Sequence, residues 1–231
     1  MKKYLGYLVV AMVLAVTSAG VAQADQFFST PAGSVNPLTG QPVSASANFS
    51  LSGSTLTLTL TNLTPDMVSA GQLLTGLSFT LSNGSGVTLN SQTGNLVNIL
   101  TGGVISNVGG LNDTLGWGFG STGGSTFELC VICSGGVTSP VTPSEGLLGL
   151  PSADGKFDNA NPSIVNNAAH LPVVLGAATY TFTVPTGVTV SDVFFTFGTQ
   201  AGGGVSAPEP SSVLLLGLGL VGLPLLMRRR S

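Results

Sequence analysis

Positive charge is almost absent from the interior of this 231-residue sequence. Of its six lysines and arginines, two follow the first methionine and three precede the last serine, so only Lys156 lies between them. From residue 25 to residue 207 this one lysine faces eight carboxylates, which gives a formal net charge of −7. Binding to nucleic acid requires clustered lysines and arginines that displace counterions from phosphates. The sequence contains no such cluster, and nucleic acid is excluded as a partner.

Helix-forming surface residues are also scarce. The middle of the chain has few of the glutamates, lysines, arginines and glutamines that usually cover helices, and threonine, serine, glycine, valine, leucine and asparagine prevail instead. We therefore expect few helices. Apolar residues remain plentiful, at 43% of the chain, and where they alternate they lie on one face. This favours a folded domain over a disordered stalk rich in glycine and serine.

Period-two alternation of apolar and polar residues is clear in two regions. In the first, residues 43–51 and 55–61 flank the turn Ser52-Gly53-Ser54, and leucines alternate with threonines in the second half. This pattern predicts a β-hairpin with a buried leucine face and a threonine face in water. Residues 179–184 and 188–197 show the same pattern around a Pro-Thr-Gly turn and are predicted to form a second unit of this kind.

Shorter segments complete the prediction of the fold class. Strands are predicted at residues 76–81, 87–89, 96–100 and 126–132. Many short strands separated by Gly, Asn, Ser and Pro turns indicate an all-β sandwich or jelly-roll-like domain. Residues 138–167 contain four prolines and several asparagines, and we expect them to form a long surface loop.

The N-terminal segment has the three parts of a secretory signal peptide. Lys2 and Lys3 precede an apolar run, and small residues then lead to Ala22-Gln23-Ala24. Cleavage after Ala24 by a signal peptidase would make Asp25 the first residue of the exported domain. A retained N-terminal anchor is the alternative, although the apolar core is short for a membrane span.

The C-terminal segment also has three parts. They are, in order, Pro208-Glu209-Pro210, the apolar residues 211–227, and the cluster Arg228, Arg229 and Arg230. A helix over residues 211–227 would be about 26 Å long, slightly short of a hydrocarbon core of about 30 Å. The arginines would remain in the cytoplasm as a membrane stop, which leaves the domain outside.

These residues together resemble a PEP-CTERM sorting signal, the tail that exosortases process in Gram-negative bacteria. The resemblance covers residues 208–231 and does not extend to the domain before them. It implies an exported protein that is held in the inner membrane in transit, is cut at the Pro-Glu-Pro motif by an exosortase, and then reaches the cell surface or the outside. An unprocessed tail anchor is the alternative. The expected division is a signal peptide at 1–24, a β-rich domain at 25–207 and the sorting segment at 208–231.

The only two cysteines form the sequence Cys130-Val-Ile-Cys133. Export places them in an oxidising compartment, which favours a disulfide. Residues three apart on a strand face opposite sides, so a bridge requires a turn, and the following Ser-Gly-Gly would allow one. Free thiols, a redox pair and a zinc site are the alternatives. The redox pair lacks the flanking helix pattern, and zinc lacks ligands because His170 is the only histidine.

Two further features are candidate sites. Asp154 and Asp158 lie in a segment rich in oxygen ligands and are a weak calcium candidate, since Lys156 and the spacing count against an EF-hand. Trp117, the only tryptophan, lies among glycines and either packs in the core or stacks on a sugar. No pattern selects a nucleophile with its base or a pair of catalytic carboxylates. We therefore expect no enzyme, no cofactor and no metal.

The function expected from these features is structural or adhesive. The two terminal signals indicate a protein of the cell surface or extracellular matrix, which we associate with exopolysaccharide and biofilm. A carbohydrate-binding or glycan-active secreted protein is the alternative.

Overall fold

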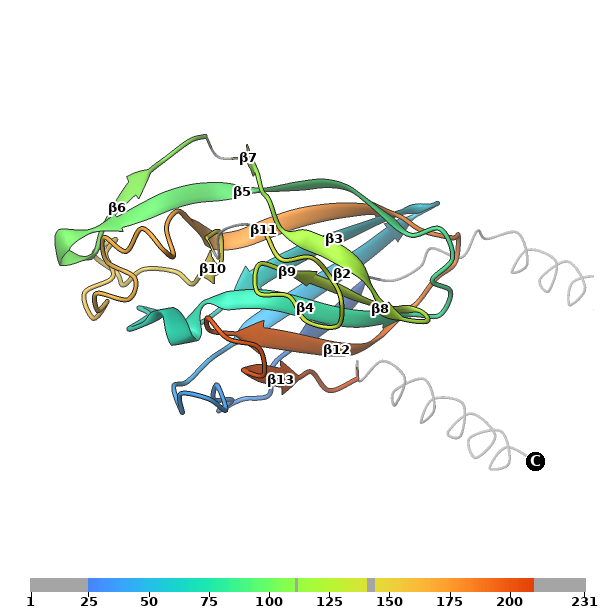
Figure 1. Ribbon diagram of the computed structural model, residues 1–231, viewed down its shortest axis with the longest axis horizontal. Coiled ribbons are helices and arrows are strands. Elements are labelled where there is room, and N and C mark those ends of the chain that lie inside the picture. Colours follow the sequence, from blue (N-terminus) through green and yellow to red (C-terminus); the bar gives the residue numbers. More distant parts are fainter. Residues whose placement is uncertain (1–24, 111, 141–143, 210–231) are drawn as a thin grey trace, which may run out of the picture.

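The computed structural model describes residues 25–110, 112–140 and 144–209 (Figure 1). Within these residues the chain forms a sheet of 13 strands with two short 3-10 turns and no α-helix. The predicted all-β class is therefore confirmed. None of the helical turns in this part of the chain is long and apolar enough to cross a membrane. The predicted signal peptide at 1–24 and membrane helix at 211–227 lie outside the described residues.

The strands pair as two groups that are joined at one point. One group has the order β1-β2-β3-β11-β5, with the short β6 and β7 on β5, and the other has the order β8-β9-β4-β12-β13. Between them β10 pairs in parallel with β11 and antiparallel with β4. The elements are β1 (Gln26–Ser29), β2 (Ala45–Ser52), β3 (Thr55–Asn62), η1 (Ala70–Gln72), β4 (Leu74–Leu81), β5 (Thr88–Leu100), η2 (Thr101–Gly103), β6 (Val104–Asn107), β7 (Asp113–Thr114), β8 (Gly118–Gly123), β9 (Thr126–Cys130), β10 (Leu147–Leu148), β11 (Val173–Thr183), β12 (Val190–Phe197) and β13 (Gly204–Ser206).

The first predicted hairpin is present as β2 and β3. The strands pair in register from Ala45 opposite Asn62 to Ser52 opposite Thr55. Gly53 has a φ of 61°, a left-handed conformation that glycine adopts without a steric penalty in so tight a turn. The leucines of β3 are buried, whereas its threonines are exposed or half-buried. Alternation thus places the leucines against the core, as predicted.

The second predicted hairpin is wrong, although both of its strands exist. β11 pairs with β3 along one edge and with β5 along the other, while β12 pairs with β4 and β13. β11 therefore has no edge left for β12, and the turn after Thr183 carries the chain from one group of strands to the other. Similarly, the predicted strands at 87–89 and 96–100 are parts of one long strand, β5.

A common aromatic core lies between the two groups of strands. The ring centroid of Phe79 on β4 is 5.3 Å from that of Phe49 on β2 and 6.0 Å from that of Phe182 on β11. Phe182 also lies 5.0 Å from Phe119 on β8. Burial of each such side chain stabilises the fold by about 1.5–3 kcal/mol. The strands of the two groups therefore face each other through these side chains.

The described part of the segment 138–167, residues 138–140 and 144–167, differs from the predicted surface loop. These residues supply β10, and they also bury Phe157 and Ile164, which are 1% and 0% exposed. These two side chains belong to a second hydrophobic cluster with Val97, Ile99 and Val173. Backbone bonds from Phe157 to Gly103 and from Asn166 to Ile99 fasten this segment to the end of β5. The prediction failed here because two isolated apolar residues among prolines and asparagines form no periodic pattern.

Candidate functional site

The C-terminal segment leaves the domain directly from a strand. β13 pairs with β12, with Gly204 opposite Thr196, and the Ala207 N–H then donates to the Val193 carbonyl at 2.8 Å. Pro208 and Glu209 follow at once and are exposed. Pro210 and the arginines Arg228, Arg229 and Arg230 lie outside the described residues. No linker therefore separates the last strand from the Pro-Glu-Pro motif.

Glu209 is bound to the domain by a bulge in β12. The register between β12 and β4 shifts between Ser191 and Phe194, which leaves one extra residue on β12. Asp192 lies in this bulge with a φ of 50°, a left-handed conformation that Asp tolerates better than most residues. Its N–H donates to Oε1 of Glu209 at 3.2 Å. The bulge thus turns a backbone donor towards the motif.

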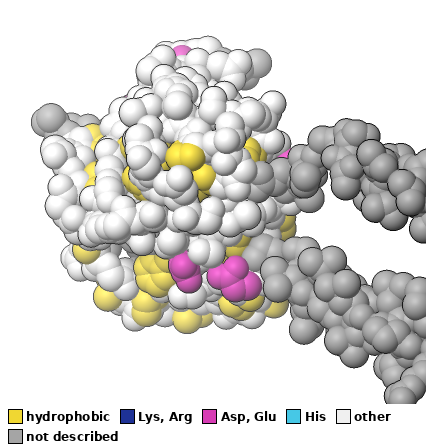
Figure 2. Space-filling view, turned by 90° about the vertical axis from the view of Figure 1, so that its right-hand side faces the viewer, with side chains coloured by type: hydrophobic (Ala, Val, Ile, Leu, Met, Phe, Trp, Pro, Cys, Tyr) yellow, Lys and Arg dark blue, Asp and Glu magenta, His cyan; other side chains and the backbone are white. Residues whose placement is uncertain are grey.

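The other end of the described chain binds the same strand. Gln26, which follows the predicted cleavage point, pairs through its side chain with Val190, at the start of β12. Ala22 and Ala24 themselves lie outside the described residues. In Figure 1 both described ends lie towards the right. Figure 2 shows that side of the molecule, on which acidic side chains are visible, some of them beside hydrophobic ones, but no lysine or arginine.

The comparisons with known proteins bear on this C-terminal end. Residues 206–230 match the family model of the PEP-CTERM protein-sorting motif. The chain carries a PEP-CTERM sorting signal. The predicted resemblance is confirmed, and the match begins within β13, at Ser206. The PEP-CTERM motif indicates an exported protein of Gram-negative bacteria that an exosortase sorts. A comparison with curated proteins finds no match to the chain.

Cys130 and Cys133 form a disulfide. Cys130 ends β9, and the chain then leaves the strand, which provides the turn that the bridge requires. The loop that follows folds over β8, where a side chain at Gly120 would lie 3.3 Å from Val137. Glu128, which is 5% exposed, accepts hydrogen bonds from the backbone and hydroxyl of Ser134 at 3.0–3.1 Å. The disulfide and Glu128 together hold the loop against the sheet.

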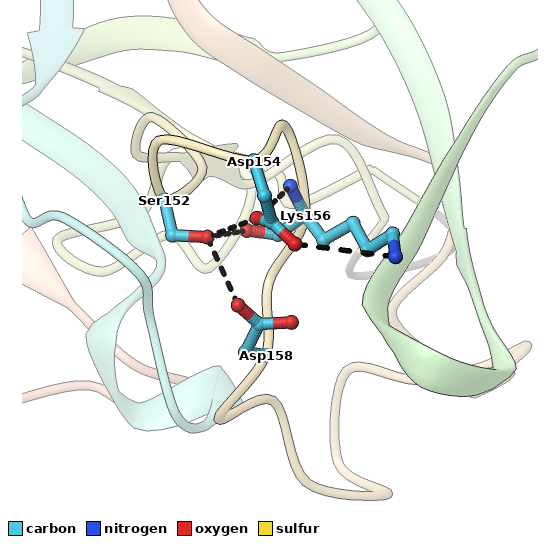
Figure 3. Close-up of polar contacts among 4 residues, drawn as sticks. All are labelled: Ser152, Asp154, Lys156 and Asp158. Carbon is cyan, nitrogen blue, oxygen red and sulfur yellow. Dashed lines mark hydrogen bonds and ion pairs between the residues drawn. The ribbon is translucent and has the colours of Figure 1, made fainter.

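Asp154 and Asp158 are brought to one hydroxyl group, that of Ser152 (Figure 3). The Ser152 oxygen lies 2.6 Å from Oδ1 of Asp154 and 3.2 Å from Oδ2 of Asp158, and Nζ of Lys156 lies 3.9 Å from Oδ2 of Asp154. The Ser152 hydroxyl, followed by the Lys156 backbone N–H and the Lys156 charge, lowers the pKa of Asp154. Within the described part of the chain, no three acidic, histidine or cysteine side chains gather as metal ligands.

Trp117 lies in the core and offers no face to a sugar. Its side chain is 3% exposed, its ring centroid is 5.6 Å from that of Tyr180, and its Nε1 donates to the Glu145 carbonyl at 2.9 Å. The sugar-stacking interpretation is therefore wrong, because stacking requires an accessible ring face. The tryptophan instead anchors the segment around Glu145, whose carboxylate also accepts from the Gly116 N–H at 2.6 Å.

The structure forms a cavity that the sequence did not reveal. It has a volume of about 490 Å³ and lies where four segments meet near η1: the β1–β2 connection, the segment before η1, the loop after Phe157 and the turn after β12. We call it the distal cavity. Its lining includes Asn36, Ser69, Ser163, His170, Thr199 and Gln200. His170 could not be assigned to a site from the sequence, because the other residues of this lining are scattered from Asn36 to Gln200.

A second hollow is lined by side chains of β9, β4 and β12. It has a volume of about 320 Å³, and Glu128, Thr126 and Phe194 are among the residues that line it. Phe194 is 37% exposed, and Glu128 is the only carboxylate in the described lining. We call it the outer-face hollow.

Proposed function

We propose that this chain is an exported protein of the cell surface or extracellular matrix with a structural or adhesive role in association with exopolysaccharide and biofilm. The observation that carries the proposal is the PEP-CTERM motif, whose Pro208 and Glu209 are exposed immediately after β13. An exosortase approaching from the membrane would meet these residues without first unfolding the core.

The proposed route begins with removal of residues 1–24 by a signal peptidase after Ala24. Residues 211–227 then hold the chain in the inner membrane, with Arg228, Arg229 and Arg230 on the cytoplasmic side. The domain from 25 to 207 folds outside as a two-layer β-sandwich, and the exosortase then cuts near Pro208. The bond of Glu209 to Asp192 supports this proposal, because it holds the motif at the boundary of the folded domain.

The exposed surface of the sheet suits contact with a polysaccharide. On β5 and β11 it presents hydroxyl and amide groups in pairs, such as Ser91 with Thr181 at 2.7 Å and Asn90 with Thr183 at 3.0 Å. These groups both donate and accept hydrogen bonds, as sugar hydroxyls do. The proposed role is not enzymatic.

The proposal is tested by the intact mass of the protein recovered from its native host. We expect a chain that begins at Asp25 and lacks the residues after the Pro-Glu-Pro motif. A mass that still includes Ser231 would contradict exosortase processing. Glu209→Ala is expected to leave the tail uncut, whereas Asp158→Ala, which removes an exposed carboxylate elsewhere, should be processed normally.

A second candidate function is carbohydrate binding, and the distal cavity favours it. Its volume lies in the range of small-ligand sites. Glycoside hydrolysis usually requires two carboxylates on either side of the bond, and the described lining of this cavity contains none. The cavity therefore supports binding of a glycan rather than its cleavage.

A further inference from the structure

We propose that the distal cavity is a binding site for a neutral saccharide. This inference rests on the proposed function, because the surrounding exopolysaccharide or a similar glycan would supply the ligand. It goes beyond that function by naming the site, its residues and the charge class of the sugar.

The position of the distal cavity suits a ligand in the surroundings of the cell. Gln26 and Glu209 bind the start of β12, at Val190 and Asp192, whereas the cavity lies at the end of the same strand, after Phe197. A strand of this length separates the two by on the order of 20 Å. In Figure 1 β12 runs from the right, where the described C-terminal end lies, to the left, and the residues after it line the cavity. A domain held to the membrane beyond Glu209 therefore has the cavity at its far end.

The walls of the cavity are held in place by hydrogen bonds between segments. Nδ2 of Asn36, a residue that is 1% exposed, donates to the Gly71 carbonyl at 2.7 Å and to the Phe197 carbonyl at 3.3 Å. Oγ of Ser163 accepts from the Ala70 N–H at 2.9 Å and donates to Oδ1 of Asn161 at 2.6 Å. The site is thus formed before a ligand arrives, which lowers the entropy cost of binding.

Several polar groups of the lining remain available for a ligand. Nδ1 of His170 lies 2.7 Å from the Ser163 carbonyl oxygen, which can only accept, so Nδ1 is the donor in this bond and Nε2 is the ring nitrogen left for a ligand. Among the described residues, no hydrogen bond uses this Nε2, the Thr199 hydroxyl or the Gln200 amide. The three side chains together offer both donors and acceptors, which is the requirement for binding vicinal hydroxyl groups.

The charge of the lining selects among saccharides. No aspartate, glutamate, lysine or arginine belongs to its described residues. An ionised sugar would therefore meet no lysine or arginine to pair with its charge. A carboxylate or sulfate group would lose its hydration without gaining a cationic partner. Leu38, which is 52% exposed, and Ala70 provide apolar surface for the C–H face of a sugar ring. The cavity therefore fits a neutral sugar better than a uronic acid.

The single histidine makes this site unusually simple to observe. In the full chain, purified without a histidine tag in lauryldimethylamine oxide, the ring Cε1–H signal of His170 is unique in the NMR spectrum. Cellobiose, maltose and lactose are titrated one by one, with digalacturonate as the anionic probe. We expect at least one neutral disaccharide to shift this signal saturably, and digalacturonate to leave it unchanged. The signal of the buried Trp117 indole should stay fixed, which reports an intact core.

Variants locate the binding. Gln200→Ala and Thr199→Ala should each raise the Kd of the responding disaccharide about tenfold, which corresponds to a loss of about 1.4 kcal/mol of binding free energy. Phe194→Ala in the outer-face hollow is the matched control and should leave the affinity unchanged. The proposal is overturned if none of the neutral disaccharides shifts His170, if digalacturonate alone does, or if Phe194→Ala removes binding while the cavity variants retain it. Exosortase processing is tested separately by the intact mass, so a failure of saccharide binding would not contradict the proposed processing.

Discussion

The side-chain amide of Gln26 pairs with the backbone of Val190 as a neighbouring strand would. Its Oε1 accepts from the Val190 N–H at 2.8 Å, and its Nε2 donates to the Val190 carbonyl at 3.1 Å. Gln26 begins β1, at the edge of one group of strands, and Val190 begins β12 in the other. One side chain therefore joins the two groups beside the point where Asp192 binds Glu209.

This joint predicts a measurable stability difference. Gln26→Ala removes two hydrogen bonds, which we expect to lower the free energy of unfolding by about 1–3 kcal/mol. Urea unfolding followed by the fluorescence of the buried Trp117 measures the change. Gln200→Ala is the matched control, since its exposed amide bonds to no described residue, and it should unfold as the parent protein does. Equal stability of all three proteins would show that the Gln26 bonds contribute nothing.

Removal of the Tyr180 hydroxyl group is expected not to destabilise the protein. Tyr180 is fully buried, and its hydroxyl oxygen has no hydrogen-bond partner among the described residues. Tyr180→Phe removes this unpaired group while keeping the ring against Trp117. Because an unpaired buried hydroxyl costs about 1–3 kcal/mol, we expect the variant to be as stable as the parent or more stable. A large loss of stability would mean that the hydroxyl is paired in solution.

The same residue predicts how stability depends on alkaline pH. Burial, with a smaller contribution from the charge of Glu145, raises the pKa of Tyr180 well above its ordinary value of 10.0. Above that pH the unfolded chain releases the proton while the folded chain retains it, so the folded state loses stability as the pH rises. Tyr180→Phe should remove this loss. Urea unfolding of both proteins between pH 9 and pH 11 makes the comparison, and parallel pH profiles would contradict it.

The disulfide predicts a modest contribution to stability. Cys130 and Cys133 are separated by only 3 positions, so the closed loop is small and the expected stabilisation is about 2 kcal/mol in the chain-entropy model. Reduction with dithiothreitol should lower the urea midpoint of the parent protein accordingly. The double variant Cys130→Ala and Cys133→Ala should already be destabilised and should not respond to the reductant. If dithiothreitol also lowered the urea midpoint of the double variant, the loss of stability would not come from reduction of this disulfide.

The loop at Ser152 predicts a titration change. The Ser152 hydroxyl is the main cause of the lowered pKa of Asp154, so Ser152→Ala should raise that pKa towards the ordinary value of 3.8. A carboxylate whose pKa is lowered in the folded state stabilises the fold above the ordinary pKa, and this contribution is lost as the pH falls through the folded value. Carbon-13 NMR of the Asp154 carboxyl measures the midpoint. Ser34→Ala, in a different loop, should leave it unchanged.

Local pattern was sufficient for several elements of this fold. Leu56, Leu58 and Leu60 alternate with threonines beside Gly53, and this alone predicts β3, its buried face and its hairpin partner. The Pro-Glu-Pro motif with the residues that follow likewise predicted the sorting signal that the family comparison confirms. Both features depend on neighbours in the chain, so they can be read without knowledge of the tertiary structure.

The partners of β11 and β12 could not be predicted in this way. Each strand alternates correctly, but the choice of neighbour depends on which edges are already occupied, and β11 is filled by β3 and β5. The burial of Phe157 and Ile164 in the second cluster depended in the same way on the position of β5.

The sequence by itself determined the β class, the first hairpin and the sorting signal at residues 206–230, because each is encoded in contiguous residues. Only the tertiary structure decided that Trp117 is enclosed, that Gln26 meets Val190, and that His170 and Gln200 line one cavity. The physical reason is that these contacts join residues far apart in the chain, and their geometry exists only once the two groups of strands have packed together.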